Sequence, residues 1–220
     1  IAPEDVARHA FRAQYDAGTI AGEAVPAYRN EAGVPADSRT ETYAALKLYI
    51  DNWRWQDVPF YLRTGKRLPE KSSSISIRFK QPPQQLFRET PLEKIEPNWI
   101  VLSIFPNECM HMQIHAKRPG LDMNTRIVDL SAQYRDPDEP ALDAYETLLL
   151  DVIEGDRSLF IRFDEVEWAW RVVDPILRSW SHEDNFIHSY TAGTWGPHES
   201  TRLFDAEDHE WRNSLKPDAS

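Results

Sequence analysis

A dense group of cations gives this chain its clearest candidate for binding an anion. Within nine positions the sequence carries Arg63, Lys66, Arg67 and Lys71. The preceding residues, DVPFYL, predict a strand that delivers Gly65 and Lys66 to its end. A glycine beside a lysine lets a backbone N–H and an ammonium approach one phosphate together. Such a group is ordinarily a solvated strand end, so these residues alone indicate a phosphate site only weakly.

The common glycine-rich nucleotide-binding motifs are absent from the sequence. No G-x-G-x-x-G follows a predicted strand, and no G-x-x-x-x-G-K-S/T occurs anywhere. We therefore expect that this chain by itself does not bind NAD(P) in the usual way.

Patterns typical of metal sites and hydrolytic centres are absent as well. His111 and His115 are four residues apart, which on a strand separates them by about 13 Å, too far for one metal ion. The motif G-x-S-x-G does not occur. The carboxylates between Asp164 and Glu167 open a predicted helix, where capping and compensation of the helix dipole are their ordinary roles. We predict neither a catalytic residue nor a metal site.

The middle of the chain predicts four strands. Alternation of apolar and polar residues predicts strands at residues 75–80 and 110–117. A uniformly apolar run that ends before Pro106 predicts a third strand at residues 99–105, and a fourth is expected at residues 127–134. Residues 16–40, with three of the eight glycines, predict a long loop with turns.

Residues 40–50 leave two alternatives open. Ser38 and Glu41 could form the capping box of a helix, whereas the β-branched and aromatic residues at both ends favour a strand. Periodicity does not decide between them.

The last third of the chain predicts helices. The period becomes helical from Leu142, and Gly155 stands where a C-terminal cap belongs. A second helix is expected with Asp164 as its N-cap and Pro175 bending or ending it, and Pro197 opens a short third one. Strands followed by helices predict an α+β fold, in which helices cover one face of a mainly antiparallel sheet.

Length and composition narrow the class of protein. A chain of 220 residues suits one domain, residues 1–220. A formal net charge of −11 argues against a nucleic-acid binder, because phosphate backbones require a basic face. It leaves room for a small phosphorylated ligand in a locally basic site. With 41% hydrophobic and 28% charged residues, the chain is expected to be globular and to have no membrane partner.

The cysteine content and the two ends suggest an intracellular fragment. Cys109 is the only cysteine, so no disulfide can form within the chain, which suits a reducing cytoplasm. The first residues, IAPEDVARHAF, show no secretory signal. Because the sequence opens without methionine, we expect it to be part of a longer protein. The tail from Trp211 is expected to fray.

A long run of residues resembles a known enzyme family. Residues 40–68, TETYAALKLYIDNWRWQDVPFYLRTGKRL, closely resemble the corresponding stretch of glucose-6-phosphate dehydrogenases. Shorter resemblances occur in RAQY, PNE, KRPG, AYETLLLDVIEGD, FIRFDEVEWAW and GTWGP, at residues 12–15, 106–108, 117–120, 144–156, 160–170 and 193–197. Together they span nearly the whole chain, which is identified as a member of this family and as its C-terminal domain.

The resemblance implies an architecture. In the family this half is a large, mainly antiparallel sheet with helices, and subunits contact each other through the sheet, as a dimer or a tetramer. It therefore implies a strand at residues 40–50 and an extended segment at residues 6–15, where the sequence pattern alone would predict a helix.

The resemblance also implies an activity for the complete protein. The family oxidises D-glucose 6-phosphate at C1 to 6-phosphogluconolactone, in the oxidative pentose phosphate pathway of the cytoplasm, and passes the hydride to NADP. The Rossmann coenzyme domain that binds NADP and the His/Asp general base lie N-terminal to this chain. It is therefore expected to be inactive alone.

Two lysines correspond to substrate-binding positions of the family. The lysine of its R-x-G-K element and a basic residue five positions later match Lys66 and Lys71, which are expected to contact the sugar phosphate. Arg63 is expected to be structural. Animal members hold a second NADP in this half, but serines stand where that site requires basic side chains, at Ser72, Ser76 and Ser103. We expect this second coenzyme site to be absent.

Three functions therefore compete. The chain could complete the substrate pocket and subunit interface of an enzyme, serve as a free-standing regulatory or scaffold protein, or act alone as a phosphosugar sensor. The presence of both Lys66 and Lys71 favours the enzyme fragment, because a scaffold does not need a phosphosugar lysine.

Overall fold

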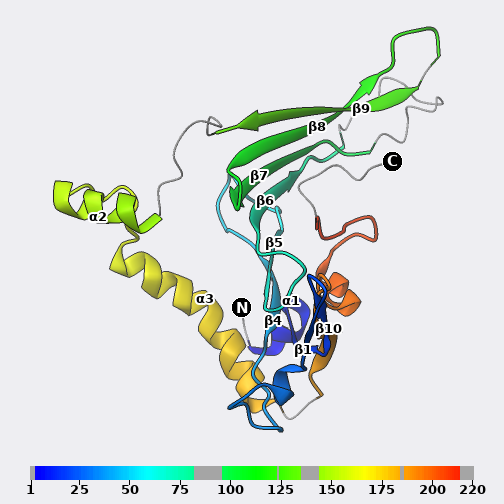
Figure 1. Cartoon of the computed structure of the whole chain (residues 1–220). Helices are drawn as coiled ribbons and strands as arrows, with labels where there is room; N and C mark the ends of the chain where they lie inside the picture. The colour runs from blue at the N-terminus through cyan, green and yellow to red at the C-terminus, as the bar shows by residue number, and fades with distance from the viewer. Residues whose placement is uncertain (1–2, 82–95, 123, 135–143, 184–185, 214–220) are drawn as a thin grey trace. The chain divides into compact units, whose positions relative to one another are not determined.

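The computed structural model describes all residues except 1–2, 82–95, 123, 135–143, 184–185 and 214–220. The chain forms two compact units (Figure 1). Unit 1 comprises residues 1–70 and 142–211, and unit 2 comprises residues 71–141 and 212–220. Each unit is described by itself.

Unit 1 is built on a four-stranded sheet with the order β10–β1–β4–β5. Its strands are β1 (Ala10–Asp16), β4 (Tyr43–Leu48), β5 (Phe60–Gly65) and β10 (His188–Thr191). The β1–β4 and β4–β5 pairs are antiparallel, and β1–β10 is parallel. The strand implied for residues 40–50 is thus confirmed as β4, whose residues alternate between buried and half-buried. Strand β10 was not predicted, since its four residues are too few to show a period.

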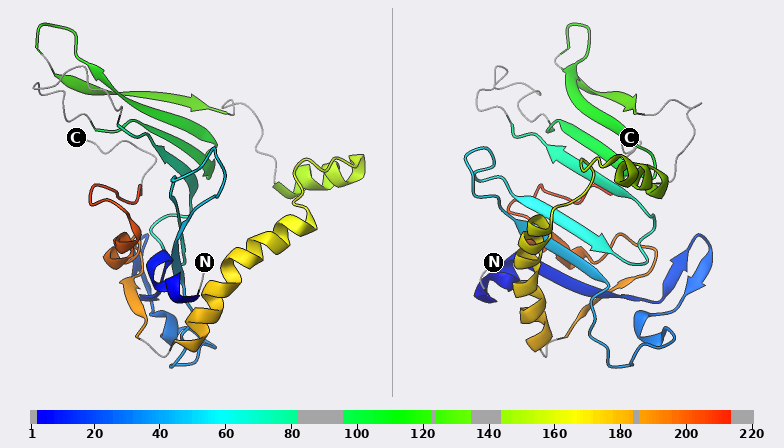
Figure 2. Two further views of the ribbon diagram at one scale, coloured as in Figure 1. Left: turned by 180° about the vertical axis from the view of Figure 1, so that it is seen from behind. Right: turned by 90° about the vertical axis from the view of Figure 1, so that its left-hand side faces the viewer.

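The segment expected to be a loop, residues 16–40, contains regular structure. A hairpin of β2 (Gly18–Ile20) and β3 (Glu23–Val25) projects from unit 1, as the right panel of Figure 2 shows. A short 3₁₀ helix, η2 (Tyr28–Asn30), follows. The loop prediction was wrong here because strands of three residues are shorter than any recognisable alternation.

Aromatic side chains fill the core of unit 1. Phe11, Tyr15, Tyr43 and Tyr190 are buried together, with ring centroids 5.4 to 6.5 Å apart. A second cluster joins Val6 and Ala10 to Ile176 and Trp180 of the long helix. These contacts attach the helix to the sheet.

The N-terminal segment is only partly extended. A 3₁₀ turn, η1 (Pro3–Asp5), leads into one helical turn, α1 (Val6–His9), before β1 begins. The extended segment implied for residues 6–15 is therefore wrong for its first four residues. Burial of Val6 against α3 explains the turn, because it places this side chain in the second cluster.

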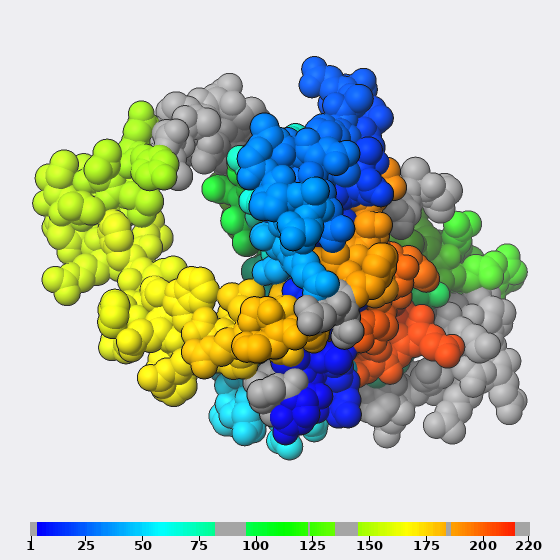
Figure 3. All heavy atoms as spheres, turned by 90° about the horizontal axis from the view of Figure 1, so that it is seen from below, coloured from blue at the N-terminus to red at the C-terminus, as the bar shows by residue number. Residues whose placement is uncertain are grey.

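The long helix α3 (Phe163–His182) differs in two ways from its prediction. Its N-cap is Arg162 rather than Asp164, and Glu165 accepts a hydrogen bond from the Arg162 N–H at 2.9 Å. The helix also continues through Pro175, so of the two predicted alternatives, bending or ending, the ending is wrong. Figure 3 shows its C-terminal part lying against the dark blue N-terminal residues. Its N-terminal half is exposed, with Phe163 79% and Trp168 64% accessible.

The other predicted helices are present. Helix α2 (Ala144–Glu154) is followed by Gly155 with a φ of +75°, as expected of a C-terminal cap. The start predicted at Leu142 lies outside the described residues. Pro197 precedes a 3₁₀ helix, η4 (His198–Leu203).

Unit 2 is an antiparallel four-stranded meander with the order β6–β7–β8–β9 (Figure 1). Its strands are β6 (Ser73–Arg78), β7 (Trp99–Phe105), β8 (Cys109–Lys117) and β9 (Thr125–Gln133). All four lie where the sequence predicted strands. The pairing register places exposed apolar side chains on one face, at Ile75, Ile77 and Leu130. The opposite face buries Val101, Ser103 and Cys109.

Candidate substrate-binding site

Lys66 stands directly after β5, as the sequence predicted. The last residue of that strand, Gly65, pairs with Tyr43 of the neighbouring strand β4. A Cβ atom at Gly65 would lie 3.0 Å from the Tyr43 ring, so a small residue is needed for this close packing. The Lys66 side chain is exposed and carries its ammonium into solvent.

Three hydrogen bonds from distant parts of the chain fix the backbone of Lys66 and Arg67. The Lys66 N–H donates to the Thr42 carbonyl at 2.7 Å, and the Tyr190 hydroxyl donates to the Lys66 carbonyl at 2.6 Å. The Gly193 N–H donates to the Arg67 carbonyl at 2.8 Å. These contacts hold Arg67 at a φ of +54°, in the left-handed region that non-glycine residues seldom adopt.

The side chain of Arg67 adds a fourth restraint. Its guanidinium donates to Glu31 at 3.0 Å, and the Tyr15 hydroxyl donates to the same carboxylate oxygen at 3.0 Å. These hydrogen bonds from Tyr15 and Arg67 lower the pKa of Glu31, and the bond to Glu31 raises the pKa of Arg67. The ion pair therefore persists at neutral pH and turns the Arg67 cation away from a ligand role.

Tyr190 is the buried member of this arrangement. Its side chain is 4% exposed, and burial raises the pKa of its hydroxyl. The hydroxyl lies 3.3 Å from Thr42 Oγ1, which accepts a hydrogen bond from the Tyr15 N–H at 2.9 Å. The phenol thus links β10 to Lys66 and to Thr42.

Arg63 is held within unit 1. Its guanidinium carbon lies 5.3 Å from the Trp195 ring centroid and 4.9 Å from that of Trp211, and it donates to the Trp195 carbonyl at 3.2 Å. Burial lowers its pKa. The Trp211 indole also donates to Ser200 at 3.0 Å, so the prediction that the chain frays from Trp211 was wrong at this residue. Residues 214–220 of that tail lie outside the described part.

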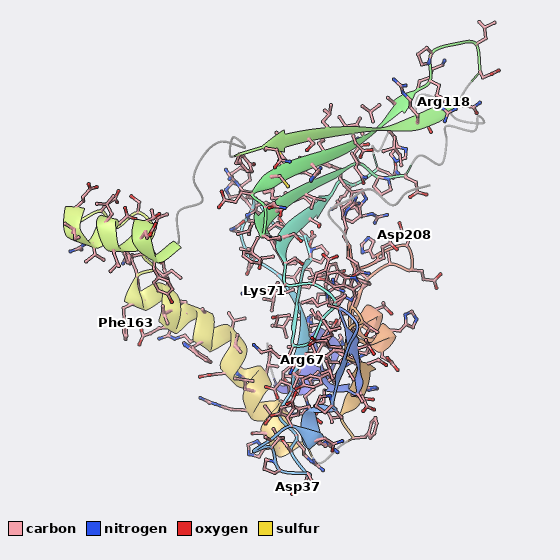
Figure 4. The ribbon with its side chains drawn as sticks, in the orientation of Figure 1. Asp37, Arg67, Lys71, Arg118, Phe163 and Asp208 are labelled. Carbon is pink, nitrogen blue, oxygen red and sulfur yellow. The ribbon has the colours of Figure 1, made fainter. Side chains whose placement is uncertain are left out.

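Lys71 belongs to unit 2, where it precedes β6. Figure 4 labels it together with Arg67 of unit 1. Its side chain is exposed, and its ammonium lies 5.2 Å from the centroid of Phe105. The cation is therefore loosely held against one ring face and can turn toward an anion.

The histidine pair of β8 and the carboxylates that open α3 were the other groups considered for chemistry. Strand β8 separates His111 from His115 as predicted, and the described residues contain no group of three or more His, Cys, Asp or Glu side chains suited to a metal. Asp164 lies in the first turn of α3 and accepts both Arg162 donors, at 3.0 and 2.7 Å. Within that same part of the chain, no helix is long and apolar enough to cross a membrane.

The described elements define an α+β domain that carries an exposed lysine on a hydrogen-bonded backbone. Comparison with known proteins specifies the family. The profile of the family described as "Glucose-6-phosphate dehydrogenase, C-terminal domain" matches residues 1–212. The chain belongs to this family.

Curated relatives of the chain are named glucose-6-phosphate 1-dehydrogenase. The chain is 45% identical over 212 residues to a glucose-6-phosphate 1-dehydrogenase of Treponema pallidum, covering 95% of this chain and 41% of the relative. It is 43% identical over 210 residues to the enzyme of Gluconobacter oxydans, covering 94% and 42%. The chain thus spans less than half the length of these relatives.

Solved structures of glucose-6-phosphate dehydrogenases also match the chain. A glucose-6-phosphate 1-dehydrogenase from Mycobacterium avium matches with a TM-score of 0.74 and 36% identity, covering 98% of this chain and 41% of that one. A second structure, described as glucose-6-phosphate dehydrogenase in complex with its substrate glucose-6-phosphate, matches with a TM-score of 0.80 and 27% identity, covering 97% and 46%. These matches confirm the predicted α+β fold of the C-terminal domain.

Sequence reasoning singled out Lys66 as a candidate but not the residues that hold its backbone. Glu31 and Tyr190 lie 35 residues before and 124 residues after it, in segments without a recognisable motif of their own. Gly193 falls within GTWGP, a run that resembles the family, and this resemblance was the one sequence signal that pointed to a residue contacting this backbone.

Proposed function

We propose that the chain is the C-terminal part of a glucose-6-phosphate dehydrogenase. This enzyme oxidises D-glucose 6-phosphate to 6-phosphogluconolactone and passes the hydride to NADP⁺. The observation that carries the proposal is the 45% identity to such an enzyme, together with an exposed lysine on a backbone fixed from three sides.

In this proposal the chain supplies two cations to the substrate pocket. Lys66 and Lys71 contact the sugar phosphate, where an ammonium compensates the charge of the dianion. The coenzyme and the general base belong to a nucleotide-binding half outside these 220 residues. The chain alone is therefore inactive, and we expect no coenzyme or metal to be held by its own residues.

The subunit contact is assigned to the sheet of unit 2. Ile75, Ile77 and Leu130 expose apolar surface on one of its faces, which favours burial against a second subunit in a dimer or tetramer. The lone cysteine suits the reducing cytoplasm, where the oxidative pentose phosphate pathway takes place.

Steady-state kinetics of the complete dehydrogenase tests the assignment of Lys66. We expect Lys66→Ala to raise KM for glucose 6-phosphate by about 10- to 100-fold, the equivalent of a lost hydrogen bond between charged groups of about 1.5–3 kcal/mol. The matched control is Lys80→Ala, an exposed lysine after β6. An unchanged KM in the Lys66 variant would remove this residue from the substrate site.

A further inference from the structure

One face of the unit 2 sheet gathers a thiol, an imidazole and a hydroxyl. Cys109 and His111 are two residues apart on β8 and so share a face, and Ser103 of β7 lies directly opposite Cys109 in the register. The Cys109 Sγ lies 3.3 Å from the His111 Nε2. Directly opposed residues have Cβ atoms about 5 Å apart, so Ser103 and Cys109 are neighbours on this face.

The Ser103 hydroxyl has no hydrogen-bond partner among the described residues. The residue is 3% exposed, and its Oγ is inaccessible to solvent. Buried hydroxyls nearly always have a partner, because an unmade hydrogen bond costs about 1–3 kcal/mol. This donor is therefore available to a small polar group that reaches Cys109.

The low solvent exposure of Cys109 limits the size of a molecule that can react with its sulfur. Cys109 is 4% exposed, so a bulky electrophile or a protein cannot reach its sulfur in the folded chain. The thiol also lies on the face opposite to Ile75, Ile77 and Leu130, the surface assigned above to the subunit contact. A reagent about as small as water is the kind that this face admits.

We propose that Cys109 is a peroxide-reactive thiol, with His111 as its base and Ser103 as a hydrogen-bond donor to the reacting oxygen. His111 Nε2 takes the thiol proton, and the sulfur attacks one oxygen of hydrogen peroxide while the O–O bond breaks. The departing hydroxide takes the proton from His111 and leaves as water. Sulfur is oxidised to the sulfenic acid, Cys–SOH, and the peroxide is reduced.

The cysteine content limits the fate of the sulfenic acid. Because Cys109 is the only cysteine, no second thiol of the chain can convert the sulfenic acid to an intramolecular disulfide. An external thiol reverses the reaction in two steps. The first thiol gives a mixed disulfide and water, and the second restores Cys109 and releases the disulfide of the reductant.

The test is the rate of peroxide oxidation of the full 220-residue chain in a buffer with a metal chelator. Hydrogen peroxide is quenched with catalase at set times, the chain is unfolded in dimedone, and the labelled Cys109 peptide is quantified by mass spectrometry. We expect the folded chain to be labelled about tenfold faster than the His111→Asn variant and several-fold faster than Ser103→Ala. His115→Asn, further along the same face, should leave the rate unchanged.

Folding is monitored separately. Ser103→Ala removes a hydroxyl that makes no hydrogen bond, so its melting temperature should not fall, and a slower oxidation of this variant then reports the loss of the donor. Equal rates for the wild type and His111→Asn would overturn the proposal. So would a folded chain that reacts no faster than the same chain unfolded in urea.

Discussion

At the scale of single residues, the position of Lys66 depends on a side chain from the far end of the sequence. The Tyr190 hydroxyl donates to the Lys66 carbonyl, and Arg67 beside it is held in a left-handed conformation. The backbone of this exposed lysine is thus held by a buried group far from it in the sequence.

Removing the Tyr190 hydroxyl tests this dependence. In the complete dehydrogenase, we expect Tyr190→Phe to raise KM for glucose 6-phosphate several-fold with a smaller change in kcat, since Lys66 remains present but is less well held. The loss of a buried hydrogen bond should also lower stability by about 1–2 kcal/mol. The control Tyr28→Phe removes a hydroxyl outside this arrangement. If Tyr190→Phe lowered stability but left KM unchanged, its role would be structural only.

Asp205 makes a stability contribution that depends on pH. Its carboxylate accepts from the Lys47 ammonium at 2.7 Å and from the hydroxyls of Tyr49 and Tyr61 at 3.0 Å each. The bond from Lys47, followed by those from Tyr49 and Tyr61, lowers the pKa of Asp205. Stabilisation by the ionised form is therefore complete above the unfolded pKa, and it is lost as pH falls through the folded one.

Urea unfolding of Asp205→Asn tests this contribution. Because the carboxylate is partly exposed, screening by solvent reduces the expected loss at pH 7 to about 1 kcal/mol. The difference from the wild type should shrink as pH falls below the unfolded pKa of about 3.9 and through the lower pKa of folded Asp205. Glu207→Gln, an exposed carboxylate nearby, should change stability by less than about 0.5 kcal/mol. A difference that stays constant with pH would contradict the assignment.

At the scale of elements, the turn before η4 requires glycine for two reasons. Gly196 has a φ of +102°, and a Cβ atom there would lie 2.3 Å from the ring of Tyr43, which is 1% exposed. The turn and the buried face of β4 are therefore packed directly against each other.

Gly196→Ala is expected to destabilise the chain by about 2–4 kcal/mol, through backbone strain and a clash that the buried ring cannot avoid. Gly33→Ala is the matched control, because Gly33 has a similar φ of +82° but no atom within 4 Å of the added Cβ. Strain alone should cost that variant about 1–2 kcal/mol. Equal losses in thermal unfolding would show that the contact with Tyr43 can relax.

At the scale of the whole molecule, the chain exposes apolar side chains on elements of both units. In unit 1 they lie on α2 and the first half of α3, and in unit 2 they lie on one sheet face. Surfaces of this kind favour association with another protein surface.

Sedimentation of the 220-residue chain, with and without glucose 6-phosphate, tests how these surfaces are used. We expect a dimer that forms independently of the sugar phosphate, because the apolar sheet face is the proposed contact and the proposed substrate pocket also needs residues outside this chain. Ile75→Lys, at an exposed position of that face, should shift the chain toward monomer. A monomer that associates only when the sugar phosphate is added would favour the phosphosugar sensor instead.

The sequence by itself determined the strands of the unit 2 meander, the α+β class and the position of Lys66. Their signals are local: alternation along β8, a glycine before a lysine, and long runs that resemble one family. Only the tertiary structure decided that residues 6–9 form a helical turn, that Arg162 caps α3, and that Tyr190 and Glu31 hold the residues around Lys66. These features depend on contacts between residues far apart in the chain, which no local pattern of side chains records.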